Sequence, residues 1–327
     1  MKEKLFEVHN LTKSFSKGRG EKINAVDSVS FDIHKGETLG IVGESGCGKT
    51  TCGRTMIGLY PKTGGDVLYR GKNVHMMNRK EYVEYTKHVQ TVFQDPYTSL
   101  NPRMKVSDII AEGIDIHHLE TDKKKRLERV YELLELVGLN KEHAERYIHE
   151  FSGGQRQRIC IARALAVNPE FVLCDEAISA LDVSIQAQIV NLLIRLQKQQ
   201  NLTYMFIAHD LTMVRYISDR VAVMYLGSIV EIGNVDEVYN NPLHPYTKIL
   251  ISAVPIADPD AEEKRQKMIA KGEVCNGKLN DKGCKFYERC PYATKHCEYE
   301  RPILNELSDG HFVACHLLQK KDKKVYR

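Results

Sequence analysis

Hydrophobic and polar residues alternate near the start of the chain, and this pattern predicts β-strands. In residues 29–33, Val, Phe and Ile alternate with Ser and Asp, which is the period of a half-buried strand. A second short strand is expected at 66–70, after the turn signal Gly64-Gly65. Between them, the apolar run 38–43 leads directly into a glycine-rich loop. We therefore expect antiparallel β-structure here, with a strand–loop–helix unit inside it.

The pattern becomes helical between about residues 96 and 150. Four apolar residues between 127 and 137 share one helical face before Gly138, and Thr121 is the expected N-cap. After this region strands and helices alternate, which indicates a parallel sheet with crossover helices. The expected elements are a helix at 152–167, a strand at 171–175, a helix at 185–199 and a strand at 203–209.

Composition restricts the class of protein. The 327 residues, 42% hydrophobic and 28% charged, suit one large globular domain with an appendage. The formal charge of +4 predicts no nucleic-acid partner, because no large basic excess is available for phosphates. No apolar run approaches the ~20 residues of a spanning helix, and the start lacks the apolar core of a signal peptide. We expect a cytosolic chain without a membrane span.

The strongest chemical signal is a phosphate loop at residues 43–50, which fits G-x-x-x-x-G-K-[ST] between a strand and a helix. Glycines let backbone N–H groups approach phosphates, and the helix N-terminus adds a positive dipole. Lys49 is placed to reach the β- and γ-phosphates, and the Thr50 hydroxyl can ligate Mg²⁺. We expect nucleotide contacts from Gly43, Glu44, Ser45, Gly46, Cys47, Gly48, Lys49, Thr50 and Thr51.

Two acidic residues end the apolar strand at 171–175. Asp175 is expected beside the phosphate loop, where it would hold Mg²⁺ directly or through water. Glu176 would orient or deprotonate the attacking water. A second anion site is expected at 151–155, where Ser152 caps a helix and Gly153 and Gly154 expose N–H groups. Two phosphate-facing surfaces on one chain suggest that two chains clamp a nucleotide between them.

These motifs together resemble the ATP-binding cassette ATPases. Their usual signature LSGGQ is FSGGQ here, through Gln155, and Phe151 replaces leucine. The resemblance implies that Gln94 is the Q-loop residue and a metal ligand, Asp182 belongs to the D-loop, and His209 is the switch histidine. It also implies that Phe15 stacks on adenine. The implied fold class is α/β: an ABC-type P-loop NTPase, with a parallel-sheet core, an antiparallel β subdomain and an inserted helical subdomain, plus a small cysteine-rich C-terminal extension.

Further segments are similar to the oligopeptide/dipeptide permease subfamily, notably 94–113, 175–189, 242–255 and the cysteine-rich tail. The resemblance implies an ATP-hydrolysing subunit that powers peptide import, with catalytic Lys49, Gln94, Glu176 and His209. Two alternatives are import of nickel or another small solute, and a soluble cassette ATPase without a membrane partner.

The resemblance also implies an assembly. Its parts are two transmembrane permease subunits, a second and paralogous ATPase subunit, and an extracellular substrate-binding protein, with this chain at the cytoplasmic face of the plasma membrane. The expected domains are residues 1–255, with a helical insertion at about 95–150, and the cysteine-rich domain 256–327.

Five of the nine cysteines crowd into the tail. The spacing of Cys284, Cys290, Cys297 and Cys315 is not a standard zinc pattern, and four thiolates suit either Zn²⁺ or an iron–sulfur cluster. The remaining alternative is reduced, metal-free thiols. The subfamily resemblance favours a [4Fe–4S] cluster, beside ATP and Mg²⁺, and Cys275 receives no role.

Overall fold

The computed structural model describes residues 3–16, 22–179, 181–254 and 282–318. These residues form two compact units. Unit 1 takes those up to 6, 33–38 and 68–208, and unit 2 takes 7–32, 39–67 and those from 209 onward.

Unit 1 contains a parallel sheet of three strands in the order β8-β7-β6. Val89 pairs with Phe171, and Phe171 pairs with Thr203, so the strands run in register and in one direction. A helix lies between consecutive strands in the sequence, which is the predicted crossover arrangement. The strands of this sheet are β6 (Val89–Val92), β7 (Phe171–Asp175) and β8 (Thr203–Ile207), and unit 1 also contains the short strand β5 (Lys72–Asn73).

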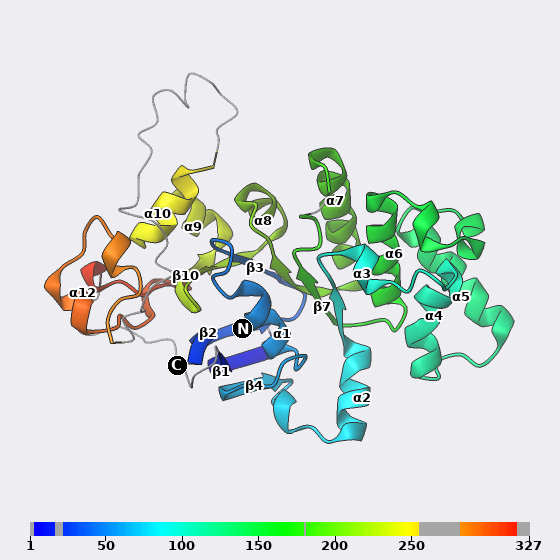
Figure 1. Ribbon diagram of the computed structural model, residues 1–327, viewed down its shortest axis with the longest axis horizontal. Coiled ribbons are helices and arrows are strands. Elements are labelled where there is room, and N and C mark those ends of the chain that lie inside the picture. The colour runs from blue at the N-terminus through cyan, green and yellow to red at the C-terminus, as the bar shows by residue number, and fades with distance from the viewer. Residues whose placement is uncertain (1–2, 17–21, 180, 255–281, 319–327) are drawn as a thin grey trace. The chain divides into compact units, whose positions relative to one another are not determined.

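Helices make up the rest of unit 1, and α3, α4, α5 and α6 gather into one group (Figure 1). The α-helices are α2 (Arg79–His88), α3 (Pro96–Ser99), α4 (Val106–Ile116), α5 (Lys123–Leu136), α6 (Gly153–Leu165) and α7 (Val183–Gln200). The 3-10 helices are η1 (Val74–Met76), η2 (Lys141–Glu145) and η3 (Ile148–Glu150). The predicted helical texture between 96 and 150 is confirmed.

The start of α5 differs from the sequence prediction. Asp122, and not Thr121, is its N-cap, because the Asp122 carboxylate accepts from the N–H groups of Lys124 and Lys125. A carboxylate there also suits the positive end of the helix dipole. The buried face of α5 includes Val130 and Leu134, as the periodicity predicted.

Unit 2 contains strands in the order β11-β12-β10-β9-β3, in which β3 pairs with β9 in parallel and the other pairs are antiparallel. These strands are β3 (Thr38–Val42), β9 (Arg220–Tyr225), β10 (Ser228–Asn234), β11 (Asn305–Ser308) and β12 (His311–Val313). The helices are α1 (Lys49–Met56), α8 (Leu211–Ile217), α9 (Val235–Asn240), α10 (Pro245–Ser252), η4 (Tyr287–Arg289), α12 (Lys295–Tyr299) and η5 (His316–Leu318).

Three strands lie in the region where antiparallel β-structure was predicted. They are β1 (Lys4–Ser16), β2 (Lys22–His34) and β4 (Gly64–Tyr69), and within unit 2 they lie in the order β2-β1-β4. The alternating positions 29, 31 and 33 are all buried, as a strand with one face on the core requires.

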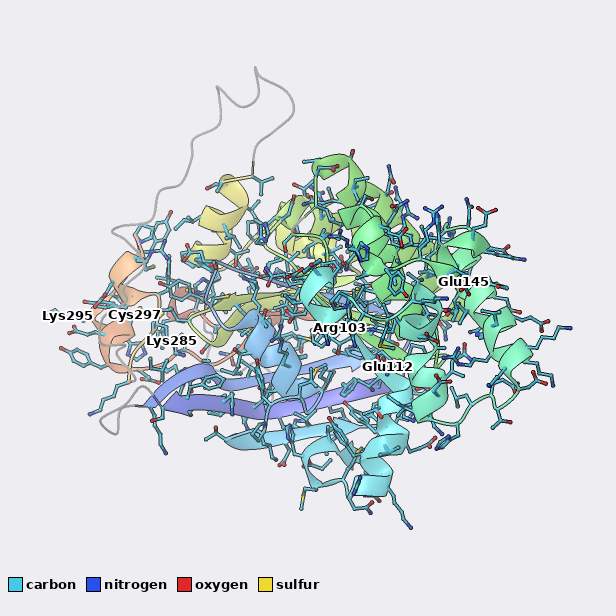
Figure 2. All side chains as sticks on the ribbon, turned by 45° about the vertical axis from the view of Figure 1, so that its right-hand side comes forward. Arg103, Glu112, Glu145, Lys285, Lys295 and Cys297 are labelled. Atoms are coloured by element: carbon cyan, nitrogen blue, oxygen red, sulfur yellow. The ribbon has the colours of Figure 1, made fainter. Side chains whose placement is uncertain are left out.

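The cysteine segment, which we define as residues 282–318, belongs to unit 2. Its strand β12 pairs with β10, with Glu231 opposite Val313 and Ile232 opposite Phe312. Figure 2 shows Lys285 and Cys297 within this segment. In the part of the chain that the structure describes, every helix is too short or too polar to cross a lipid bilayer.

Candidate functional site

The phosphate loop follows β3, in which every residue is buried. Gly43 and Gly48 have φ angles of 149° and 101°, which L side chains rarely adopt. A Cβ on Gly43 would lie 2.2 Å from the carbonyl oxygen of Met224, and one on Gly48 would lie 2.1 Å from that of Ala25. Glycine is therefore required at both positions by backbone conformation and by the close approach of other main chain.

Lys49 is the first residue of α1, and it is only 4% exposed. Its Nζ donates to the carbonyl oxygens of Gly43 at 2.8 Å and Glu44 at 3.0 Å, so the ammonium lies inside the loop. Thr50 and Thr51 continue the first helical turn and are half-buried. The lysine, the threonines and the helix N-terminus thus occupy the arrangement that a phosphate chain with Mg²⁺ requires.

The other loop residues divide by exposure. Ser45 and Gly46 are exposed, whereas Cys47 is buried. Burial raises the pKa of the Cys47 thiol, although Lys49 partly opposes this effect. The thiol of Cys47 therefore stays protonated near neutral pH.

Glu44 has contacts that the sequence did not reveal. Its N–H donates to the hydroxyl of Tyr246 at 2.9 Å, and its carboxylate accepts two hydrogen bonds from Arg289. The side chain of Glu44 is consequently held by the protein itself. Its partners lie about 200 and 245 residues away in sequence, so no local motif could have identified them.

Phe15 is the penultimate residue of β1, and 44% of its surface is accessible. Its ring meets that of Tyr60 edge to face at 6.2 Å, and Lys13 Nζ lies 4.8 Å from the ring centroid. An exposed, supported aromatic face is suited to stacking on a nucleobase.

Asp175 and Glu176 follow each other in unit 1, at the end of β7. Asp175 is 1% exposed, whereas Glu176 is half-buried. Glu176 has a φ of 50°, and its N–H donates to the carbonyl oxygen of Ile207 at 3.0 Å. The left-handed backbone turns the chain sharply after the strand, and such strain is typical of functional positions. Sequence reasoning named both carboxylates but gave no sign of this conformation.

Gln94 is exposed just after β6, and the next residue, Asp95, caps α3 by accepting from the N–H of Tyr97 at 2.8 Å. His209 is likewise exposed in the connection that precedes α8. Asp210 caps α8 by accepting from the N–H of Thr212. In both motifs the predicted functional residue stays accessible while its acidic neighbour fixes the start of the helix.

The signature motif forms the N-terminus of α6. Ser152 is its N-cap, and Ser152 and Gln155 exchange the two hydrogen bonds of a capping box. A Cβ on Gly154 would lie 2.6 Å from Cγ2 of Ile185, and one on Gly153 would lie 3.3 Å from a methyl group of Leu181. The two glycines thus permit close packing against the start of α7, as well as leaving their N–H groups bare.

Asp182 in the D-loop is the N-cap of α7, where it accepts from the N–H of Ile185 at 3.0 Å and from the hydroxyl of Ser184 at 2.7 Å. The Ser184 hydrogen bond, followed by that of Ile185, lowers the pKa of Asp182, so it stays ionised. This capping role is visible in the structure, whereas the sequence placed Asp182 only by resemblance.

The predicted residues fall into two sets. Unit 2 contains Phe15, the phosphate loop, His209 and the tail cysteines, and unit 1 contains Gln94, the two carboxylates, the signature and Asp182.

The four tail cysteines line one small pocket of unit 2, with Cys290, Cys297 and Cys315 under 10% exposed. Burial, together with a smaller effect of the neighbouring cysteines, raises the pKa of Cys284 to about 11. Within residues 3–16, 22–179, 181–254 and 282–318, no three His, Cys, Asp or Glu side chains are positioned as metal ligands. Cys275 lies outside the described residues.

Two known protein families match this chain, one in the region of the phosphate loop and the signature, the other in its C-terminal part. The family described as "ABC transporter" matches residues 26–179, which include the phosphate loop, the signature and the strand with its two carboxylates. The family described as "Oligopeptide/dipeptide transporter, C-terminal region" matches residues 230–297, which include three of the four tail cysteines.

Curated relatives match nearly the whole chain. The oligopeptide transport ATP-binding protein OppF of Bacillus subtilis is 57% identical over 96% of this chain and 97% of its own. OppF of Escherichia coli is 50% identical over 90% of this chain and 87% of its own. The dipeptide transport ATP-binding protein DppF of Lactococcus lactis is 55% identical over 82% of this chain and 86% of its own.

Solved structures of ATP-binding cassettes have the same fold. A dimeric cassette, MJ0796, in a post-hydrolysis state with ADP and Pi has a TM-score of 0.65 at 27% identity, over 70% of this chain and 98% of its own. The cassette cbiO1 of Clostridium perfringens has a TM-score of 0.64 at 25% identity, over 73% and 92%. The predicted α/β cassette fold is confirmed, and the chain belongs to the ABC transporter ATPases, in the family of oligopeptide and dipeptide transport ATP-binding subunits.

Proposed function

We propose that this chain hydrolyses ATP to power the import of oligopeptides or dipeptides through partner membrane subunits. The observation that carries the proposal is the near full-length similarity to oligopeptide and dipeptide transport ATP-binding proteins. Peptides are therefore favoured over nickel or another small solute, and a transporter is favoured over a soluble ATPase. The chain would act at the cytoplasmic face of the plasma membrane, bound to two permease subunits and served by an extracellular substrate-binding protein.

Each site residue has a role in this proposal. The phosphate loop and Lys49 bind the β- and γ-phosphates, and Phe15 stacks on adenine. Mg²⁺ is held by Thr50, Gln94 and Asp175, because oxygen ligands suit this ion. Phosphoryl transfer then depends on positioning and charge neutralisation by these groups.

Hydrolysis itself is assigned to Glu176 as the base for the attacking water, with His209 contacting the γ-phosphate. The half-buried position of Glu176 and its left-handed backbone support this assignment. The signature motif and Asp182 would serve the nucleotide of a second ATPase subunit, which we infer to be a paralogue. Two chains are needed because the signature and the phosphate loop are each half of a composite site.

The domain assignment is also a proposal. Residues 1–255 would form the cassette, with the helical insertion at about 95–150, and residues 256–327 the cysteine-rich domain. The run of helices from α3 to η3 supports the insertion. The pairing of β12 with β10 means that the cysteine-rich domain would complete a cassette sheet instead of standing apart.

A Glu176→Gln substitution tests the catalytic proposal. In the complex assembled with its partner subunits, this variant should bind MgATP normally and lose about 10²- to 10⁴-fold in hydrolysis rate, because it lacks the base. Glu128→Gln, on the exposed face of α5, is the matched control and should retain the full rate. Hydrolysis by Glu176→Gln within a few-fold of this control would exclude Glu176 as the base. Peptide-stimulated ATPase activity tests the substrate class, and stimulation by nickel alone would contradict it.

We further propose a [4Fe–4S] cluster bound by Cys284, Cys290, Cys297 and Cys315. The gathering of four thiols around one pocket supports it. Protein purified without oxygen should be brown and contain iron and sulfide in equal amounts. Cys290→Ser should lose both, whereas Cys160→Ser in α6 should keep both. One zinc per chain would replace the cluster with a zinc site, and an ordered segment without metal would refute both.

A further inference from the structure

Arg289 of the cysteine segment reaches the phosphate loop. Its Nη1 donates to Oε2 of Glu44 at 2.9 Å, and its Nη2 donates to Oε1 at 3.0 Å. The two parallel hydrogen bonds fix both the distance and the orientation of the carboxylate, which a single contact does not. Glu44 is the second residue of the phosphate loop, so the loop is held from the C-terminal end of the chain.

The arginine end of this ion pair is buried, whereas the Glu44 side chain is 29% exposed. Arg289 is 9% exposed, and its guanidinium lies 5.8 Å from the ring centroid of Tyr225 and 5.9 Å from that of Phe286. The two rings pack beside the guanidinium and restrict it to the geometry of the pair. Removing one partner of such a pair leaves a poorly solvated charge, so its loss has a larger effect than loss of a surface ion pair.

A second contact holds the main chain of the same residue. The hydroxyl of Tyr246 accepts from the N–H of Glu44 at 2.9 Å, and Tyr246 is fully buried. Its ring packs against those of Tyr225 and Phe286, with centroids 4.7 and 5.5 Å away. Arg289 and Tyr246 therefore rest on the same two aromatic residues and hold Glu44 at its side chain and its backbone.

The position of Glu44 also affects the side chain of Lys49. The Glu44 carbonyl oxygen accepts from Lys49 Nζ at 3.0 Å, so the placement of this peptide unit affects the direction of the ammonium group. We propose that Arg289 and Tyr246 are positioning residues for ATP: through Glu44 they hold the phosphate loop in the conformation that presents Lys49 and the loop N–H groups to the β- and γ-phosphates. The inference rests on the proposed assignment of residues 43–50 to ATP, and it makes the cysteine segment part of the nucleotide site.

The test uses the assembled complex and measures KM for ATP, kcat and nucleotide affinity. Arg289→Gln should raise KM and the nucleotide dissociation constant about tenfold, with kcat within about twofold, because positioning for binding is lost while Glu176 is untouched. Arg289→Lys keeps the positive charge but cannot make the two parallel hydrogen bonds of the guanidinium, so its KM should lie between those of the wild type and Arg289→Gln. Tyr246→Phe should raise KM about threefold by removing one hydrogen bond to Glu44.

A matched control is Arg301→Gln. Arg301 is an arginine of the same segment, but its partners are Asp27 and Ser228, outside residues 43–50. This variant should keep the wild-type KM. A general loss of order in the segment would change Arg301→Gln and Arg289→Gln alike, and that result would overturn the proposal.

A double substitution separates positioning from a structural role. If Arg289 acts through Glu44, then Glu44→Gln added to Arg289→Gln should raise KM no further, whereas independent effects would multiply. Lys49→Ala separates the inference from its premise. If Lys49→Ala retains full ATP binding, the assignment of the loop to ATP is wrong. If Lys49→Ala loses binding while Arg289→Gln and Tyr246→Phe keep the wild-type KM, only the positioning role is overturned.

Discussion

Glu231 of β10 should be one of the costliest residues to replace in unit 2. Its side chain is completely buried, and it accepts three hydrogen bonds. Oε1 accepts from the N–H of Leu243 at 2.9 Å and from Nε2 of His311 at 2.8 Å, and Oε2 accepts from the N–H of His244 at 2.8 Å. One carboxylate thus joins β10, the entry to α10 and β12 of the cysteine segment.

The perturbation is Glu231→Gln, which keeps the size of the side chain. One oxygen becomes an NH₂ group, whose hydrogens must face at least one of the three donors. The change therefore loses at least one hydrogen bond to a charged group, worth about 1.5–3 kcal/mol. The substitution also leaves a buried donor without an acceptor, which adds to this cost, and we expect a total loss of about 3 kcal/mol.

Native-state hydrogen exchange is the suitable assay, because it reports on β10 and β12 separately from the rest of the chain. A loss of about 3 kcal/mol should accelerate exchange in peptides covering His311–Val313 by more than about 100-fold, provided that these amides exchange through local opening. Glu237→Gln, at an exposed position of α9, is the control and should change the rate little. Exchange in Glu231→Gln within about threefold of this control would show that the carboxylate does not hold the segment.

Three further predictions concern pH, the signature and assembly. Burial lowers the pKa of His244 to about 4, whereas an unfolded histidine has a pKa of about 6.5. The free energy of unfolding should therefore be highest above pH 6.5 and fall by about 3 kcal/mol as the pH drops toward 4. His244→Asn, which keeps a helix-capping side chain, should flatten this pH profile. Gly154→Ala places a methyl group 2.6 Å from Ile185 Cγ2, so it should lower the free energy of unfolding by about 1–3 kcal/mol and reduce ATPase activity. The same change in an Ile185→Ala background should cost less stability, and an equal cost would refute the packing argument. Dilute monomeric protein should hydrolyse ATP far more slowly per site than the assembled complex, and equal rates would exclude a site shared between two chains.

Local patterns were enough to predict the elements that carry the motifs. The strand at 171–175 and the phosphate loop lie where the sequence placed them, because an apolar run and a glycine pattern act over a few residues. The N-cap of α5 was misplaced by one residue, since Thr121 and Asp122 are both good caps and only the geometry distinguishes them. Boundaries of this kind depend on which side chain reaches the N–H groups.

Long-range features could not be predicted in this way. The contact between Arg289 and Glu44 joins residues 245 positions apart, and the pairing of β12 with β10 joins segments about 80 apart. The left-handed conformation of Glu176 also lacks a local signal, because glutamate has no preference for it. Such features arise from tertiary packing, which overrides what a short stretch of sequence specifies.

The pairing of β12 with β10 has a consequence for any attempt to shorten the chain. Strand β10, residues 228–234, contains the apolar side chains Ile229, Val230 and Ile232. Backbone groups along one side of this strand are hydrogen-bonded to the cysteine segment; for example, the N–H of Ala314 donates to the carbonyl oxygen of Val230. A protein ending before residue 282 would leave this strand as an unprotected sheet edge, open to pairing with another copy. The cysteine segment therefore also protects the sheet edge from aggregation, and an isolated cassette that lacks this segment should self-associate as its concentration is raised.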